Sequence, residues 1–309
     1  MRYNLEKIYS YAIAHTKASS LLIYDNKSDI LLGEPNYISF NTRSIAKTVM
    51  AIAYGILIEK SNEKYNLETF IYPYLENELT INNTENLEYI KKLKVKHLLT
   101  HTMGYGEPLL MSKDIPTIDN DKLVSYSLNY PIKYEPGRYF KYSNVGYYIL
   151  SCLMDKLLNE GAYEFINNNL FGKIGITNPR WDRYGSHLAG ATKLYLSDLD
   201  LLKIGKIILD KGKFEGINLV ASKYIEMMNT PIVYTSSFSK YKYISENSYG
   251  LGIRISNEGV IFAIGTGGQM IAILPKEEII IVTTNQGDEE FASIIKDDVE
   301  KIISCIKGE

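Results

Sequence analysis

Cysteine is scarce in this sequence: among 309 residues it occurs only at Cys152 and Cys305. Two cysteines so far apart cannot form a disulfide framework, and neither has neighbours at the spacing of metal ligands. Both lie within apolar helical patterns, so we expect buried free thiols. The sequence therefore predicts neither a disulfide-stabilised fold nor a cysteine-based metal site.

Net charge and long apolar runs are also nearly absent. The formal net charge is -2 at pH 7, which gives no electrostatic basis for binding nucleic acid or an acidic membrane surface. No stretch approaches the length of an apolar membrane span, and residues 1–17 lack the apolar core and cleavage site of a signal peptide. We therefore expect a cytoplasmic protein with no nucleic-acid or membrane partner.

What is present is the composition of an ordinary globular protein. Hydrophobic residues make up 45% and charged residues 23%, and the length suffices for one large domain or two interleaved ones. Tyrosine is unusually common, with 26 residues, which is consistent with amphipathic packing and a tyrosine-lined cleft.

Strand patterns occur at both ends of the chain. At the start, residues 1–16 have helical spacing, and two strands at 19–25 and 30–32 are joined by a turn. At the end, the patterns predict strands at 250–255, 260–264, 269–274 and 279–284, and an amphipathic helix at 288–306. Between the ends, they predict helices at 48–59, 93–104, 119–129, 145–158, 163–170, 198–209 and 222–228.

The simplest assembly of these elements is an α/β fold of the α+β type. One antiparallel sheet would be built from both chain termini and flanked by the terminal helices, with a mostly helical domain inserted. The predicted domains are residues 1–43 with 247–309 for the sheet and 44–246 for the insertion, and we expect the active site at their junction.

The stretch from Asn41 to Lys47 leads into an apolar run over residues 48–59. Its apolar residues recur at helical spacing without a proline, so it predicts a helix that Asn41 or Thr42 could cap. Ser44 and Lys47 are three residues apart, so their hydroxyl and amine can meet on one face. Free backbone N–H groups near the helix start would favour negative charge developing at Ser44.

A serine and a lysine at this spacing are weak evidence alone, because many helices begin with a capping serine and carry a solvated lysine. Here, however, Lys47 lies one turn into a largely apolar helix. Burial disfavours the charged form of a lysine, and the neutral form is the one that acts as a base. Ser44 and Lys47 are therefore a candidate nucleophile and base, provided that the rest of the chain supplies partners.

Two further elements are candidates for those partners. Tyr142, Ser143 and Asn144 lie on a loop between predicted helices, and a glycine-rich run over residues 265–268 lies between two predicted strands. With 26 tyrosines, a Tyr-x-Asn match is expected by chance. The glycine-rich run would by default be a turn, and it does not fit the spacing of a dinucleotide or P-loop motif.

In this order, the three elements resemble those of the serine β-lactamase and penicillin-binding-protein superfamily. The likeness is greatest to its class C β-lactamase-like branch, which includes esterases, D-aminopeptidases, DD-peptidases and aminohexanoate-dimer hydrolases. It extends over nearly the whole chain. Three segments carry it: residues 97–104 (HLLTHTMG, similar to HLLTHTSG), 135–144 (EPGRYFKYSN, similar to PGxxFxYSN) and 263–269 (AIGTGGQ, similar to AxGxGGQ).

The resemblance implies a reaction through an acyl-enzyme, without a metal or an organic cofactor. Ser44 would attack a carbonyl, and neutral Lys47 would accept its proton. Tyr142 would protonate the leaving group and later activate water. Asn144 would hold Lys47 and bind an amide oxygen of the substrate. The N–H groups of Ser44 and Gly268 would form the oxyanion hole.

The third element departs from the family pattern. The edge that would bind substrate, where glycines let the backbone approach, consists of Gly265, Thr266, Gly267 and Gly268. β-Lactamases and DD-peptidases usually have Lys-Thr-Gly or His-Thr-Gly there, and the cation helps to bind a substrate carboxylate. This chain has Gly265 at the first position, although Arg254 or Lys193 could supply a cation instead. The departure favours an ester or amide over penicillin or D-Ala-D-Ala.

We therefore predict a serine hydrolase that cleaves a small ester or amide. The alternatives are a true β-lactamase or DD-peptidase, with a β-lactam as ligand, and a catalytically silent binding protein of the same fold. The identity of the substrate and the oligomeric state stay open at this point.

Structural roles are expected for several other residues that could otherwise suggest a site. His97 and His101 are interpreted as histidines satisfied by the local backbone. The acidic residues that follow Ser197 are interpreted as helix caps. Trp181 could line the cleft or pack in the core, and the sequence favours neither.

Overall fold

A computed structural model of the chain describes residues 4–78, 83–235, 239–287 and 289–309. The predicted first residues of the two terminal helices, 1–3 and 288, lie outside these ranges. The chain divides into two compact units: Met1–Thr48 with Tyr195–Glu309 form the first, and Val49–Leu194 form the second. Both ends of the chain thus belong to the same unit.

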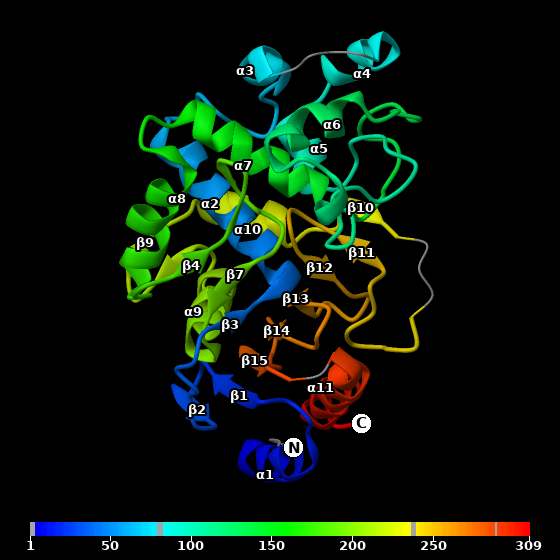
Figure 1. Cartoon of the computed structure of the whole chain (residues 1–309). Coiled ribbons are helices and arrows are strands. Elements are labelled where there is room, and N and C mark those ends of the chain that lie inside the picture. Colours follow the sequence, from blue (N-terminus) through cyan, green and yellow to red (C-terminus); the bar gives the residue numbers. More distant parts are fainter. Residues whose placement is uncertain (1–3, 79–82, 236–238, 288) are drawn as a thin grey trace. The chain divides into compact units, whose positions relative to one another are not determined.

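In the described residues, the first unit contains an antiparallel sheet of eight strands (Figure 1). β1 (Ser20–Asp25) lies between β2 (Ile30–Leu32) and β15 (Ile279–Thr284), and it pairs with β15 from Ser20 opposite Thr284 to Asp25 opposite Ile279. The other strands follow in the order β14 (Met270–Leu274), β13 (Ile261–Ile264), β12 (Arg254–Ile255), β11 (Ser248–Tyr249) and β10 (Val233–Tyr234). This sheet, built from both ends of the chain, confirms the predicted fold class.

The strand predicted at 250–255 is right for residues 254–255, which form β12, and wrong for residues 250–253, which form a turn between β11 and β12. The Gly250 N–H donates to Ile253 O across 2.9 Å, and Gly252 has a φ of +74°, which glycine adopts without strain. A side chain at Gly250 would also clash with Met228 O, which lies 2.0 Å from the position of a Cβ. Both glycines are therefore required by the turn.

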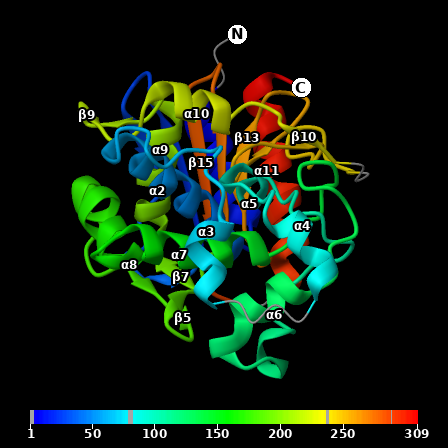
Figure 2. The same ribbon diagram turned by 90° about the horizontal axis from the view of Figure 1, so that it is seen from above.

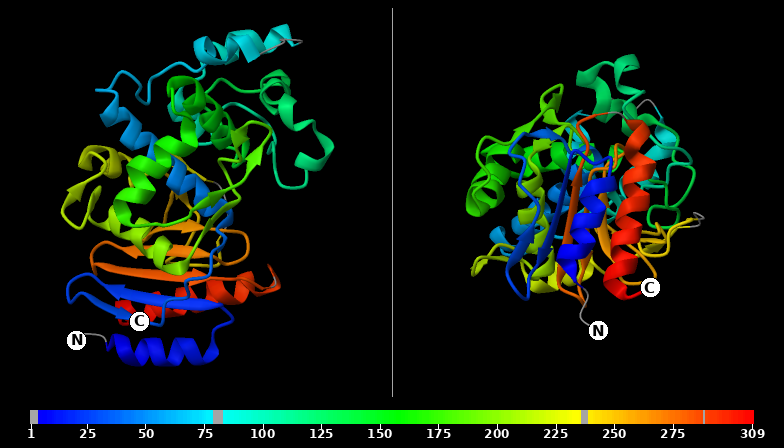
Figure 3. Two further views of the ribbon diagram at one scale, coloured as in Figure 1. Left: turned by 60° about the vertical axis from the view of Figure 1, so that its left-hand side comes forward. Right: turned by 90° about the horizontal axis from the view of Figure 1, so that it is seen from below.

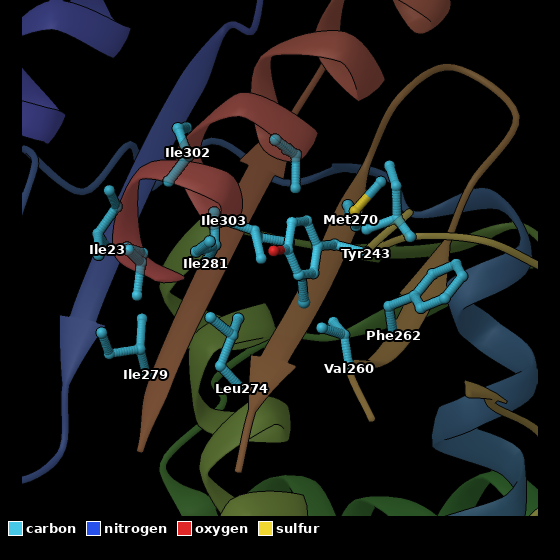
Figure 4. Close-up of a cluster of buried hydrophobic side chains, with 14 of the residues drawn as sticks. Ile23, Tyr243, Val260, Phe262, Met270, Leu274, Ile279, Ile281, Ile302 and Ile303 are labelled. Atoms are coloured by element: carbon cyan, nitrogen blue, oxygen red, sulfur yellow. The ribbon is translucent and has the colours of Figure 1, made fainter. Parts of the chain in front are cut away.

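Helices α1 (Leu5–His15) and α11 (Ala292–Lys307) lie side by side on one face of the sheet (Figure 3). Because side chains alternate along a strand, Ile23 and Ile281 point to this face, where they join Ile303 of α11 in a buried apolar cluster (Figure 4). Each fully buried isoleucine contributes about 1.5–3 kcal/mol by removing apolar surface from water. The core of the first unit therefore lies between the sheet and these two helices.

Helix α9 (Asp198–Leu209) covers the opposite face of the sheet, so that the strands run between α9 and α11 (Figure 2). At Gly205 the helix backbone lies close to the sheet, because a Cβ there would lie 3.0 Å from Cγ2 of both Ile271 and Ile280. α9 thus packs on the sheet within the first unit, and the predicted domain boundaries, which place residues 44–246 in an insertion, stay a prediction.

The start of α9 is fixed by a capping box and by a buried carboxylate. The Asp200 N–H donates to Ser197 Oγ at 3.2 Å, and the Ser197 N–H donates to the Asp200 carboxylate at 3.1 Å, which confirms the predicted cap. Asp198 is 1% exposed and accepts hydrogen bonds from Ser20 Oγ of β1 and from the Asn36 N–H at 2.8 Å. Asp198 therefore ties the loop that follows β2 to both the sheet and the helix.

The second unit is mostly helical and is centred on α7 (Val145–Leu157), whose first ten residues are all buried. Helix α5 (Val95–Leu99) packs closely on α7, because a Cβ on Gly146 would lie 2.5 Å from Leu98 O. α2 (Ala46–Lys60) begins in the first unit and continues into the second. The other helices are α3 (Tyr72–Leu75), α4 (Leu87–Ile90), α6 (Leu123–Asn129) and α8 (Gly161–Ile166).

Some predicted helices have different ends. The helix predicted at 93–104 stops at Leu99, because His101 has a left-handed φ of +57° that no helix accommodates. The helix predicted at 163–170 is α8, which starts earlier and continues as a π-helical turn at Asn167–Phe171. In contrast, α10 (Ser222–Met228) has the predicted bounds.

Several two- or three-residue strands lie outside the large sheet. β3 pairs with β7 in the first unit, with Phe40 opposite Leu196, and β5 pairs with β6 and β8 with β9 as short hairpins. Their bounds are β3 (Phe40–Asn41), β4 (Arg180–Trp181), β5 (Arg183–Tyr184), β6 (His187–Leu188), β7 (Leu194–Leu196), β8 (Lys213–Phe214) and β9 (Ile217–Asn218).

The expectation of buried cysteines is right for Cys152 and wrong for Cys305, which is exposed. The reason is that α11 buries Ile302, Ile303 and Ile306, whereas Cys305 lies at the edge of this apolar face, where it lines an open groove between α1 and α11. Trp181 is buried, and its Nε1–H donates to Thr192 O at 3.0 Å, which favours core packing. Among the described residues, no helix combines the length and the apolar character needed to cross a membrane.

Candidate active site

A short turn in the first unit presents Ser44. Asn41 Oδ1 accepts from the Arg43 N–H at 3.0 Å, and the chain forms a 3-10 turn at Arg43–Ile45 before α2 begins. Of the two predicted caps, Asn41 therefore makes the side-chain bond. Arg43 has a φ of +53°, which is uncommon for a residue other than glycine and costs on the order of 1 kcal/mol. Backbone strain next to a candidate nucleophile is typical of functional sites.

Ser44 and Lys47 meet as the spacing predicts. Lys47 Nζ donates to Ser44 Oγ at 3.1 Å. Lys47 is 1% exposed, whereas Ser44 is partly exposed. Burial disfavours the charged form of a lysine in general, and a neutral amine at this position could accept a proton from the hydroxyl it contacts. The pair thus combines an accessible nucleophile with a shielded base.

The glycine-rich run lies against the same turn. A Cβ at Gly265 would lie 2.9 Å from Thr42 O and 2.9 Å from Arg43 Cβ, so the structure leaves no room for a side chain at this position. The lysine or histidine of the related Lys-Thr-Gly and His-Thr-Gly motifs could not be accommodated here without moving the backbone. The first unit therefore brings together two of the three predicted elements.

Two buried amide side chains that were not among the predicted site residues brace this run. The Gly267 N–H donates to Gln269 Oε1 at 3.1 Å, and Gln269 Nε2 donates to Asn285 O at 3.1 Å. Asn285 Nδ2 in turn donates to Gly267 O at 2.6 Å. Gln269 belongs to the quoted AIGTGGQ segment, which is the only sequence signal for it. No pattern in the sequence pointed to Asn285, because it follows β15 and is distant in sequence from the run that it contacts.

The N–H of Gly268 is engaged within the turn. It donates to Gly265 O at 3.2 Å, while Gly268 O accepts from Thr283 Oγ1 at 2.8 Å. Gly268 has a φ of +90°, and a Cβ there would lie 3.0 Å from Ile295 Cδ1. An oxyanion hole that uses this N–H requires the bond to Gly265 to be shared or broken, so that role stays a prediction.

The cations suggested as replacements for the missing lysine have other contacts. Arg254 Nη1 lies 2.7 Å from Glu246 Oε2, and Lys193 Nζ lies 4.9 Å from the centre of the Tyr184 ring. Arg43, next to Ser44, pairs with Glu289 at 2.7 Å. These contacts give no support to Arg254 or Lys193 as the cation that would bind a substrate carboxylate.

The third predicted element lies in the second unit, just before α7. Ser143 is buried, and its Oγ accepts from the Leu109 N–H and donates to Leu109 O, both at 2.8 Å. Asn144 Nδ2 donates to Leu110 O at 2.9 Å. Tyr142 is thus followed by two residues that are anchored to the loop at residues 109–110. Its meeting with Ser44, Lys47 and the glycine-rich run stays a prediction.

The two histidines of the HLLTHTMG segment behave differently. His97 Nδ1 accepts from the Lys94 N–H at 3.2 Å, which confirms the expected local partner. Burial lowers the pKa of His97 to about 4, with a smaller contribution from Lys96. The expectation is wrong for His101, whose Nδ1 accepts from the distant Ser143 N–H at 3.4 Å.

Comparisons with known proteins show the family and the fold of this chain. Residues 39–301 match the family model described as beta-lactamase. Among curated protein sequences, none is significantly similar. An octameric penicillin-binding protein homologue from Pyrococcus abyssi has a TM-score of 0.74, with 17% identity over 99% of this chain and 77% of that chain.

Two other solved structures are similar over almost their whole length. A penicillin binding protein from Bacillus halodurans has a TM-score of 0.69 and 18% identity, covering 97% of this chain and 100% of that chain. EstCE1, a hydrolase with promiscuous acyltransferase activity, has a TM-score of 0.67 and 13% identity, covering 96% and 97%. At these identities the structures show a shared fold. Because the family model matches most of the sequence, the chain belongs to the beta-lactamase family.

Proposed function

We propose that the protein is a serine hydrolase that cleaves a small ester or amide through an acyl-enzyme on Ser44. The observation that carries this proposal is the 3.1 Å contact between the partly exposed Ser44 hydroxyl and the buried Lys47 amine. Membership of a family that is usually hydrolytic supports it. The strained turn at Arg43 and the glycine-rich run packed against it add further support.

The proposed reaction has two halves. In the first, neutral Lys47 accepts the Ser44 proton while Oγ attacks the carbonyl carbon; Tyr142 then protonates the leaving alcohol or amine as its bond breaks. In the second, Tyr142 accepts a proton from water, which attacks the acyl-enzyme. As the bond to Ser44 Oγ breaks, the protonated Lys47 returns its proton to Oγ, and all three residues regain their starting states. Asn144 is proposed to bind an amide oxygen of the substrate. The roles of Tyr142 and Asn144 are supported by the resemblance of segment 135–144 to PGxxFxYSN.

The proposed substrate lacks an essential carboxylate. A cation at residue 265 is excluded by Thr42 O and Arg43 Cβ, and the alternative cation Arg254 is paired with Glu246. A neutral ester or amide is therefore a better candidate than a β-lactam or a D-Ala-D-Ala peptide. The β-lactamase alternative nevertheless shares the Ser44 chemistry and is tested in the same experiment.

The experiment measures turnover of p-nitrophenyl acetate and labelling by a fluorophosphonate probe. We expect both in the wild type and neither in Ser44→Ala. Ser186→Ala, which removes an exposed hydroxyl outside the proposed site, is the matched control and should behave as the wild type. Nitrocefin hydrolysis, or a stable penicillin adduct on Ser44, would favour the β-lactamase or DD-peptidase alternative.

Two outcomes would contradict the proposal. If the wild type is neither labelled nor active beyond Ser44→Ala, Ser44 is not an activated nucleophile. If esters or penicillins then raise the melting temperature without being turned over, the protein is a silent binding member of the family.

A further inference from the structure

His101 occupies a fixed position in the second unit. It follows α5, is 4% exposed, and has a left-handed φ of +57°. Asparagine, aspartate and histidine are the residues other than glycine that adopt this conformation most often. The Thr102 N–H on its far side donates to His97 O at 3.0 Å, which holds the segment against the end of α5.

The backbone on both sides of Tyr142 is bonded to His101. The Lys141 N–H donates to His101 O at 2.9 Å, and the Ser143 N–H donates to His101 Nδ1 at 3.4 Å. The imidazole also packs directly on the Tyr142 ring, with 4.5 Å between ring centres and 49° between the planes. A single histidine thus contacts the residue before Tyr142, Tyr142 itself and the residue after it.

The imidazole is itself held in place. The Tyr147 ring lies 5.3 Å from it and the Phe140 ring lies 5.9 Å from it, the latter edge-on. Tyr147 is fixed in turn, because its hydroxyl donates to Leu99 O at 2.7 Å. The position of the imidazole is therefore defined by α5, by α7 and by the segment that carries Tyr142.

The hydrogen bond from Ser143 also bears on the protonation of the ring. Nδ1 accepts this bond through its lone pair, which is available in the tautomer that carries its proton on Nε2. The backbone amide of Ser143 therefore favours this tautomer of His101.

We infer that His101 is a positioning residue that holds the Tyr142 phenol in the orientation required for proton transfer. This inference rests on the proposed hydrolase function, in which Tyr142 serves both half-reactions. Loss of the imidazole frees the Tyr142 ring on one face and leaves the Ser143 N–H without its acceptor. A misplacement of a catalytic group by about 1 Å can reduce a rate on the order of 10²-fold. His101 would therefore affect turnover by holding the Tyr142 phenol in place.

Two substitutions compatible with the left-handed backbone test this role. His101→Gly removes the imidazole without straining φ, and His101→Asn keeps an oxygen near the position of Nδ1. For p-nitrophenyl acetate, we expect His101→Gly to lower kcat on the order of 10-fold or more while KM changes little. His101→Asn should recover part of that loss, because it restores an acceptor for the Ser143 N–H.

The decisive readout is a double-mutant cycle with Tyr142→Phe. If His101 acts through the phenol, His101→Gly has little further effect on kcat once Tyr142 is phenylalanine. The control is His97→Asn, which changes a buried histidine of the same segment whose Nδ1 accepts from a different amide. Its effect on kcat should be the same in both backgrounds.

Other outcomes overturn the inference. If the effects of His101→Gly and Tyr142→Phe on kcat multiply, or if His101→Asn is no better than His101→Gly, His101 is only structural. That failure differs from failure of the proposed function, in which Ser44→Ala would leave turnover and fluorophosphonate labelling unchanged. Circular dichroism melts of each variant ensure that only folded protein is compared.

Discussion

Lys47 Nζ lies 3.1 Å from Ser44 Oγ, and only the serine of this pair is accessible to solvent. The Ser44 hydroxyl can contact a substrate, whereas the Lys47 amine, about one turn further along the chain, is shielded. The amine can therefore exchange a proton with Ser44 while few water molecules compete for it. This division of exposure is what a serine nucleophile activated by lysine requires.

Replacement of Lys47 tests that relationship. We expect Lys47→Met to reduce kcat/KM for p-nitrophenyl acetate on the order of 10²–10⁴-fold, because the base is lost. The melting temperature should not fall, because methionine fills a similar volume without a buried polar group. Lys60→Met, at the exposed end of α2, is the control. Activity of Lys47→Met within threefold of the wild type would contradict the role of Lys47 as base.

Gly265→Ala should disturb the turn that presents Ser44. The added methyl group would lie 2.9 Å from Thr42 O and 2.5 Å from Gln269 Oε1. Overpacking of this kind costs about 1–3 kcal/mol, measurable by urea denaturation, and we expect ester turnover to fall with it. Gly287→Ala, whose added methyl group would meet Asn285 Oδ1 at an ordinary 3.5 Å and no other atom of the described residues within 4 Å, should be nearly neutral. Equal stability of the two variants would show that the contact at Gly265 is not tight.

Asp198→Ala should be among the most destabilising single changes in the first unit. The carboxylate is 1% exposed, and its loss leaves Ser20 Oγ and the Asn36 N–H without their acceptor. We expect unfolding free energy to fall by about 3 kcal/mol, because buried donors would remain unsatisfied. Asp297→Ala, which removes a partly exposed carboxylate of α11, provides the comparison. A smaller loss for Asp198→Ala than for Asp297→Ala would contradict this account.

His97 should make stability depend on pH between about 4 and 6.5. Its pKa falls from 6.5 to about 4 in the folded protein, chiefly through burial and secondarily through Lys96. Between these values the unfolded chain binds a proton that the folded chain does not. Stability is therefore complete above pH 6.5 and declines as pH falls toward 4, by at most about 3 kcal/mol.

Urea denaturation at several pH values measures this decline. His97→Asn keeps an acceptor for the Lys94 N–H but removes the titrating group, so its stability should fall less between pH 6.5 and pH 4 than that of the wild type. Parallel curves for the two proteins would show that His97 is not the group responsible.

Local patterns predicted the elements whose boundaries are set locally. α10 has the predicted bounds, and β15 spans the predicted strand, which is an uninterrupted run of β-branched residues. The meeting of Ser44 and Lys47 also followed from helical spacing alone. These features depend on residues close together in the sequence.

Such patterns could not predict contacts between residues that are distant in the sequence. The turn at 250–253 depends on Met228 O, which excludes a side chain at Gly250. The partner of His101 is Ser143, and Asn285 reaches Gly267 from the end of β15. Nothing in the spacing of these residues indicates that they touch, because tertiary packing alone brings them together. Cys305 was misplaced because it lies at the edge of the apolar face of α11, where burial depends on how closely α1 packs.

The pairing of β1 with β15 joins two segments from opposite ends of the chain. During synthesis at the ribosome, β1 emerges long before β15. Until β15 is made, the edge of β1 that pairs with it has no partner strand. Such delayed, long-range pairing slows folding and exposes an apolar edge to other chains. The order in which this protein is made is therefore a reason to expect slow maturation and a need for chaperones. A circular permutant that begins at β10 would remove this liability, because its eight strands would be made in the order in which they lie in the sheet.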